Sequence, residues 1–188
     1  TNLYYMVMEF VDGEDLADVL HRRHHVSEIE VLNYIHQAAN GLRATASKGI
    51  IHRDIKPDNL MITAGDNIIK VTDFGLAKNA ATITQTNAKI RVGTPAFMSP
   101  EQCDGLKLDA RSDMYSLGCT AYVALTGRLP YDGETPFAIM LKHKADPVPH
   151  VRERMPEVEA GIDALIYRMM AKDKHDRFDT WDELIDKV

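Results

Sequence analysis

The stretch His52-Arg53-Asp54-Ile55-Lys56-Pro57-Asp58-Asn59 sets the organisation of the chain. Apolar Ile50-Ile51 precedes it and apolar Leu60-Met61-Ile62 follows it. A second polar stretch, Asp73-Phe74-Gly75, comes at the end of the apolar-rich run Ile68-Ile69-Lys70-Val71. Short apolar and β-branched runs interrupted by polar residues are typical of strands joined by loops. The pattern therefore predicts two loops that carry charged side chains, with strand-like runs around them.

The two stretches resemble the catalytic loop and the metal-binding loop of protein kinases, whose signatures read H-R-D-L-x-x-x-N and D-F-G. Ile55 stands at the Leu of the first signature, which is a conservative apolar exchange. The alternative is a polar loop between two strands that happens to hold charges. One signature alone would leave that alternative open, whereas both in order, with strand-like runs around them, argue against it.

The resemblance implies a catalytic role for Asp54, Lys56, Asn59 and Asp73. Phosphoryl transfer from ATP depends on positioning and charge neutralisation more than on covalent chemistry. Asp54 would accept or orient the proton of the attacking hydroxyl, and Lys56 would neutralise charge on the transferring phosphoryl group. Asp73 and Asn59 would supply the oxygen ligands that Mg²⁺ or Mn²⁺ prefers. The implied cofactors are therefore ATP and a divalent cation.

Composition is that of an ordinary globular domain. At 188 residues and 45% apolar content the chain suits one compact domain with a core. A net charge of −6 argues against nucleic acid or an anionic membrane as a partner. Cys103 and Cys119 have no metal-type spacing and are expected to be reduced thiols. With no secretory signal and no apolar run of about 18 residues, we expect a cytoplasmic location, any membrane anchor lying outside this chain.

The amino-terminal segment, residues 1–14, is expected to hold the last strand of the small kinase lobe and the hinge. Residues 1–11 are rich in aromatic and β-branched residues, which favour a strand. The resemblance implies contacts to ATP from this segment and its surroundings: Met8 as a core gatekeeper residue, the backbone of Glu9 and Val11 at the adenine, Asp15 at the ribose and Met61 beneath the adenine.

The glycine-rich loop and the strand lysine of the family do not occur in this sequence. It contains no Gly-x-Gly-x-x-Gly and no Val-Ala-Ile-Lys. The resemblance therefore covers the large carboxy-terminal lobe, residues 15–188, and the hinge, with the small β-rich lobe expected as a partner in cis. Because ATP binds between the two lobes, we expect the isolated chain to bind nucleotide poorly and to be inactive.

Residues 76–101 resemble an activation segment that ends in Ser99-Pro100-Glu101, where the family signature has Ala-Pro-Glu. Positions 82–87 are polar and β-branched, without helix caps. Arg53 directly precedes Asp54, and the resemblance implies that a phosphorylated activation segment docks on this arginine. The predicted regulatory phosphosites are Thr84 and Thr86, with Thr82 third; the alternative is that these threonines are spacers.

The stretch Gly93-Thr94-Pro95 resembles the substrate-facing loop. Thr94 together with Lys56 is the combination found in serine/threonine kinases, in which Thr94 would hydrogen-bond toward the catalytic loop. Asp58 can favour a basic residue in the substrate, but Val123 stands where a second acidic residue is usual. We therefore expect no strong requirement for basic residues.

The rest of the chain predicts helices. Ser27 and Glu30 have the spacing of a capping box, and the helix that follows is expected to bury Ile29, Leu32, Ile35 and Ala39 and to end at Gly49. Residues 109–127 are apolar nearly all round, which predicts a central buried helix. Six to seven helices and a few short strands make a mainly α fold, as in the large lobe of protein kinases.

The resemblance also implies structural roles for His52, Glu101, Asp113 and Arg177. Asp113 would accept hydrogen bonds from the catalytic-loop backbone near His52 because a buried carboxylate needs partners. Arg177 would pair with Glu101, and breaking that buried pair is expected to destabilise the fold.

Three functions follow as hypotheses. The first is a serine/threonine protein kinase that transfers phosphate from ATP to protein substrates. Its sequence motifs are most similar to those of bacterial kinases of the eukaryotic type. The second is a pseudokinase-like binding or scaffold module, against which the intact Asp54, Asn59 and Asp73 argue. The third is a small-molecule phosphotransferase, a class that usually lacks the Gly-Thr-Pro and Pro-Glu segments found here.

Overall fold

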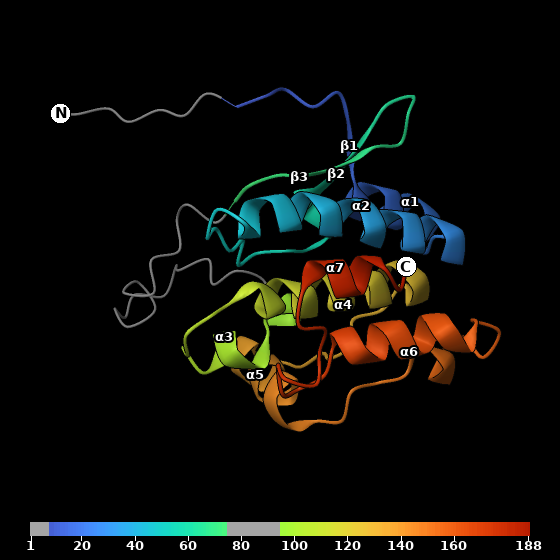
Figure 1. Ribbon diagram of the computed structural model, residues 1–188. Coiled ribbons are helices and arrows are strands. Elements are labelled where there is room, and N and C mark those ends of the chain that lie inside the picture. Colours follow the sequence, from blue (N-terminus) through green and yellow to red (C-terminus); the bar gives the residue numbers. More distant parts are fainter. Residues whose placement is uncertain (1–7, 75–94) are drawn as a thin grey trace.

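The computed structural model describes residues 8–74 and 95–188. Within these ranges it is mainly helical, with one small sheet, as the sequence predicts (Figure 1). The α-helices are α1 (Leu16–Arg23), α2 (Glu28–Ala46), α3 (Pro100–Cys103), α4 (Ala110–Thr126), α5 (Pro136–Ala145), α6 (Ala160–Met169) and α7 (Trp181–Ile185). The 3-10 helices are η1 (Pro57–Asn59), η3 (Pro95–Phe97) and η4 (Val151–Glu153).

The sheet contains β1 (Gly13–Asp15), β2 (Leu60–Thr63) and β3 (Ile69–Val71) in the order β1-β2-β3, all antiparallel. The strands expected after the first signature loop and before the second are therefore confirmed, whereas the apolar pair Ile50-Ile51 before the first loop forms no strand. Gly13 lies so close to β2 that a Cβ atom there would be 2.0 Å from the carbonyl oxygen of Ile62. Only glycine allows β1 to pair at this distance.

The strand expected over residues 1–11 is wrong for the part that the structure describes, because residues 8–12 form no strand. A strand needs a partner for its backbone N–H and C=O groups, and no described strand pairs with this segment. Met8 is 62% exposed and Phe10 is 87% exposed. The expectation that Met8 is a core residue is therefore also wrong within the described chain.

The capping box of α2 is confirmed: the Glu30 N–H donates to Ser27 Oγ at 3.3 Å, and the Ser27 N–H donates to Glu30 Oε2 at 2.9 Å. Of the residues expected on the buried face, Ile35 and Ala39 are buried and Leu32 is partly buried, but Ile29 is 80% exposed. The buried residues of the helix are Val31, Tyr34, Ile35, Ala38, Ala39 and Leu42. The position of this face follows from packing, because α2 lies against α4, α7 and β3. The helix ends at Ala46, and Gly49 adopts its positive φ of 73° beyond that end.

Helix α4 is buried along almost its whole length and packs between α2 and α6, as the apolar sequence predicts (Figure 1). Gly118 permits the contact with α6, because a Cβ atom there would be 2.8 Å from the Cβ of Met169. Gly127 ends the helix with a φ of 65°. The core thus forms around α4, and the two signature loops lie beside its first turn.

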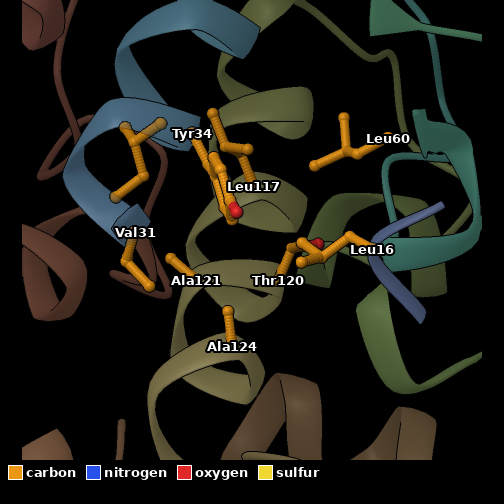
Figure 2. A pocket seen from close by; sticks show the side chains of 9 residues that line it. Leu16, Val31, Tyr34, Leu60, Leu117, Thr120, Ala121 and Ala124 are labelled. Carbon is orange, nitrogen blue, oxygen red and sulfur yellow. The ribbon is translucent and has the colours of Figure 1, made fainter. Parts of the chain in front are cut away.

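A small cavity of about 10 Å³ lies among α1, α2 and α4, with Leu16, Tyr34 and Leu117 in its wall (Figure 2). A water molecule needs about this much space and also needs polar partners, which this apolar wall does not offer. The cavity is therefore a packing gap in the core. No helix in the described ranges is long and apolar enough to cross a membrane.

Candidate active site

The backbone of the first signature loop is fixed by Asp113, from the first turn of α4. Its Oδ2 accepts a hydrogen bond from the His52 N–H, and its Oδ1 accepts one from the Arg53 N–H, both at 2.8 Å. Burial raises the pKa of Asp113 to about 6, although the two backbone amides favour its ionised form. These are the contacts with the loop backbone that were expected of Asp113. The bonds hold Arg53 at a φ of 70°, which non-glycine residues rarely adopt.

The side chain of His52 connects the first signature loop to the second. It is fully buried, and its Nε2 lies 2.7 Å from the carbonyl oxygen of Thr72, directly after β3. A carbonyl can only accept, so Nε2 carries the proton and Nδ1 can accept the Asp54 N–H at 3.3 Å. The ring also lies 4.6 Å from that of Phe74, between centroids. His52 therefore aligns the two loops without an exposed reactive group.

Asn59 makes a second connection between the loops. Its side-chain Nδ2 donates to the backbone oxygen of Asp54 at 2.7 Å. The backbone oxygen of Asn59 accepts the Thr72 N–H at 3.0 Å. The side chain is buried, with 4% exposed. Because Nδ2 is used in ordering the loop, Oδ1 is the atom of Asn59 that can serve as a ligand. The short helix η1 brings Asn59 back under Asp54.

Lys56 and Asp58 lie at the start of η1. Their side chains approach to 3.8 Å, with Lys56 19% and Asp58 56% exposed. A separation at the edge of ion-pair distance, with one partner open to solvent, contributes little to stability. Both side chains therefore remain able to turn toward a bound molecule.

Asp73 is exposed at the end of the strand run, with a φ of 55°. In the described part of the chain, no cluster of three or more His, Cys, Asp or Glu residues could hold a metal ion. Mg²⁺ in nucleotide sites is commonly held by one or two protein groups, with phosphates and water completing the octahedron. Asn59 Oδ1 and the Asp73 carboxylate suit such a site, which depends on the nucleotide for the remaining ligands.

The residues expected to meet ATP outside the loops lie in the small sheet and in the segment before it. Glu9 forms an ion pair with Lys70 of β3. Asp15 caps α1 by accepting the Asp18 N–H at 2.8 Å, so one of its carboxylate oxygens is already used. Val11 and Met61 are half-buried, and Met8 is exposed. Glu9 thus contacts Lys70, which pairs with Met61 across β2 and β3, but Met8 lies away from the core.

Four predicted residues, Thr82, Thr84, Thr86 and Thr94, lie outside the described residues. Arg53, on which the phosphorylated segment was expected to dock, lies in the described catalytic-loop stretch.

Glu101 and Arg177 form the buried pair that the resemblance implies. The guanidinium donates to both carboxylate oxygens, at 2.7 and 2.9 Å, and Arg177 is only 1% exposed. The Ser112 hydroxyl adds a hydrogen bond of 2.6 Å to the same carboxylate. Burial opposes ionisation of Glu101, but the arginine and the hydroxyl outweigh it and hold the pKa below its ordinary value. The pair anchors α3 to the segment before α7.

Sequence reasoning missed one connection of the site. The side chain of Gln102, in α3, donates to the backbone oxygen of Arg53 at 2.9 Å. The spacing of Ser99 and Gln102 is that of a capping box, S-x-x-Q, and that spacing was the available signal. It predicts a helix start, but it carries no information on what else the glutamine reaches.

Comparison with known proteins gives a consistent picture. A family model described as "Protein kinase domain" matches residues 1–187. A probable serine/threonine-protein kinase of Clostridium acetobutylicum is 39% identical over 189 residues, covering 100% of this chain and 28% of the relative. Serine/threonine-protein kinase PknB of Mycolicibacterium smegmatis is 42% identical over 187 residues, covering 97% of this chain and 29% of the relative. The chain thus spans under a third of the length of these relatives.

Solved structures agree with these relatives. The PknI kinase domain of Mycobacterium tuberculosis superposes with a TM-score of 0.75 at 27% identity, covering 96% of this chain and 63% of that one. A structure of Rad53 residues 1–466 in complex with AMP-PNP superposes with a TM-score of 0.77 at 30% identity, covering 95% of this chain and 44% of that one.

Proposed function

The chain belongs to the protein kinase domain family, and on that premise we propose that it forms the catalytic lobe of a serine/threonine protein kinase. The reaction is transfer of the γ-phosphoryl group of ATP to serine or threonine hydroxyls of proteins. One observation supports this more than any other: Thr72, next to Asp73, accepts from His52 and donates to Asn59, at 2.7 and 3.0 Å. These bonds hold the two signature loops in one arrangement before any ligand binds.

In the proposed mechanism Asp54 receives or orients the proton of the substrate hydroxyl. The Asn59 side chain fixes the backbone oxygen of Asp54, so this carboxylate is oriented in advance. Lys56 turns from Asp58 to the transferring phosphoryl group and offsets its charge. Asn59 Oδ1 and the Asp73 carboxylate would hold Mg²⁺ or Mn²⁺, which would supply charge neutralisation at the phosphates.

ATP would lie along the sheet edge, with Met8, the backbone of Glu9 and Val11, and Met61 at the adenine and Asp15 at the ribose. Protein kinases use ATP and a divalent cation as a family, and the Rad53 structure contains an ATP analogue. We propose that the opposite wall of the ATP site comes from the small lobe, outside these 188 residues. The hinge, residues 1–14, joins that lobe to residues 15–188.

In this proposal, phosphorylation of the activation segment regulates the kinase. Phosphorylation of Thr84 or Thr86, with Thr82 third, supplies a charged group that Arg53 binds. Thr94 holds the substrate loop against the catalytic loop, and Asp58 contributes to substrate choice without imposing a basic motif. The proposed location is the cytoplasm, with any membrane anchor outside this chain.

The scaffold hypothesis remains the second candidate function. The observation that favours it is the exposure of Met8 and Phe10, which offers an apolar surface to a partner. A scaffold would bind ATP or a partner without phosphoryl transfer, so an activity measurement separates the two.

The test uses the full-length protein with labelled ATP and Mg²⁺. Asp54→Asn should lower transfer by about 10²–10⁴-fold, and Asp73→Asn should abolish metal-dependent transfer. Asp186→Asn, the same chemical change at an exposed residue after α7, is the matched control and should leave transfer unchanged. Phosphate mapped on Thr82, Thr84 or Thr86 in the wild type, and in neither active-site variant, would support autophosphorylation. Binding of ATP without any labelling would overturn the proposed activity in favour of the scaffold.

A further inference from the structure

The side chain of Gln102 makes two different hydrogen bonds with its two polar atoms. Its Oε1 accepts the Ser99 N–H at 3.0 Å, which completes the capping box at the start of α3. Its Nε2 donates to the backbone oxygen of Arg53 at 2.9 Å, across 49 positions of sequence. The first bond serves the helix, and the second connects α3 to the catalytic loop.

The Arg53 carbonyl matters because Arg53 has the unusual φ of 70°. Such a conformation in a non-glycine residue persists only when its surroundings hold it. Asp113 holds the N–H side of Arg53, and Asn59 holds the backbone oxygen of Asp54. Between these two points lies the peptide group that joins Arg53 to Asp54. Gln102 binds its oxygen.

We propose that Gln102 is a positioning residue: it fixes the Arg53–Asp54 peptide and thereby orients the Asp54 carboxylate. The inference rests on the proposed kinase function and deepens it. It also gives α3, which follows the segment expected to face the protein substrate, a direct mechanical connection to the catalytic loop. A shift of α3 would be transmitted through this side chain to the Arg53–Asp54 peptide.

Gln102→Glu separates the two bonds. Glutamate keeps an oxygen for the Ser99 N–H, and it is an ordinary capping-box residue at this helix position, where negative charge is favourable. Ionised glutamate has no hydrogen to donate to the Arg53 oxygen. Gln102→Met, of similar length but without a hydrogen-bonding group, removes both bonds without adding charge, so the effect that the two variants share is that of the bond to Arg53. Ser99→Ala is the matched control, because it removes the Ser99 hydroxyl from the cap and leaves the Gln102 amide in place.

The measurements are steady-state kinetics and amide hydrogen exchange on the full-length protein. Both Gln102 variants should lower kcat about tenfold with KM for ATP changed by less than about twofold, the loss expected for one hydrogen bond to an ordered loop. Exchange in residues 52–56 should become about tenfold faster. Ser99→Ala should change neither quantity by more than about twofold, even if it lowers the melting temperature.

Two results would overturn the proposal. In one, kcat and exchange in residues 52–56 stay within about twofold of wild type in both Gln102 variants. In the other, kcat falls while exchange in that segment is unchanged, which would place the effect of Gln102 elsewhere. If the wild type transfers no phosphoryl group, the proposed function fails. Hydrogen exchange, which needs no activity, then still decides whether Gln102 orders the loop.

Discussion

Asp113 and Glu101 are both buried carboxylates near the first signature loop, yet their surroundings give them opposite properties. Asp113, 3% exposed, accepts from two neutral backbone amides, and burial raises its pKa to about 6. Glu101, 7% exposed, also loses hydration, but the Arg177 guanidinium binds both of its oxygens and its pKa is lowered. Neutral donors only partly offset burial of a negative charge, whereas a cation at hydrogen-bond distance outweighs it.

The difference corresponds to two tasks. Arg177 uses each of its nitrogens, donating also to the backbone oxygens of Ala171, Arg111 and Lys172, so the pair joins α3, the start of α4 and the segment after α6. Asp113 joins only the first turn of α4 to the catalytic loop. The Glu101 site therefore holds the fold together, and the Asp113 site sets the shape of the loop at a cost in stability.

Removing the cation from the Glu101 site should have the largest effect. Arg177→Met would leave a buried, unpaired carboxylate and lower the free energy of unfolding by about 3–5 kcal/mol. Urea unfolding followed by circular dichroism measures this. Adding Glu101→Met to the same protein should recover much of the loss, since two apolar side chains leave no uncompensated charge. If Arg177→Met lowered the free energy of unfolding by less than about 1 kcal/mol, the cation would not be what stabilises the buried Glu101 carboxylate.

The pH dependence of stability should have opposite signs at the two sites. Folding raises the pKa of Asp113 from 3.8 to about 6, so its stabilising contribution is full below pH 4 and is lost as pH rises through 6. Glu101 behaves in reverse, because its pKa is lowered from 4.5, and its contribution is lost as pH falls. The free energy of unfolding of wild type minus that of Asp113→Asn should therefore fall by about 2 kcal/mol between pH 4 and pH 7. A difference independent of pH would contradict the assignment for Asp113.

The smallest change in the free energy of unfolding is expected at an exposed ion pair, which serves as the reference for the buried Glu101–Arg177 pair. Arg43 of α2 lies 2.6 Å from Asp182 of α7, but the two side chains are 47% and 68% exposed. Water already solvates both charges, so Arg43→Ala should change the free energy of unfolding by less than about 0.5 kcal/mol. The same urea titration used for Arg177→Met measures it. A change as large as that of Arg177→Met would show that burial is not what distinguishes these pairs.

The sequence predicted the parts of the structure that depend on local chemistry. The capping residue Ser27 gave the start of α2, where its side chain accepts the expected backbone N–H of Glu30. The apolar run gave α4, and the two signatures gave the loops beside β2 and β3. The family resemblance also gave the Glu101–Arg177 pair, although 76 positions separate the two residues.

Three features were beyond the sequence. The strand expected before residue 12 depends on a partner strand, which the described part of the chain does not provide. The buried face of α2 turned away from Ile29 because α4, α7 and β3 together decide which side of a helix loses contact with water. The Gln102 bond to Arg53 depends on the position of α3 over the loop.

By itself, then, the sequence determined which groups are present and where helices begin and end, because caps, periodicity and signature spacing act over a few residues. Only the tertiary structure decided which of those groups are buried and what they bind. Burial set the pKa of Asp113 and the pairing of Glu101, and the placement of α3 beside the loop set the bond of Gln102 to Arg53; both depend on segments that are far apart in the chain.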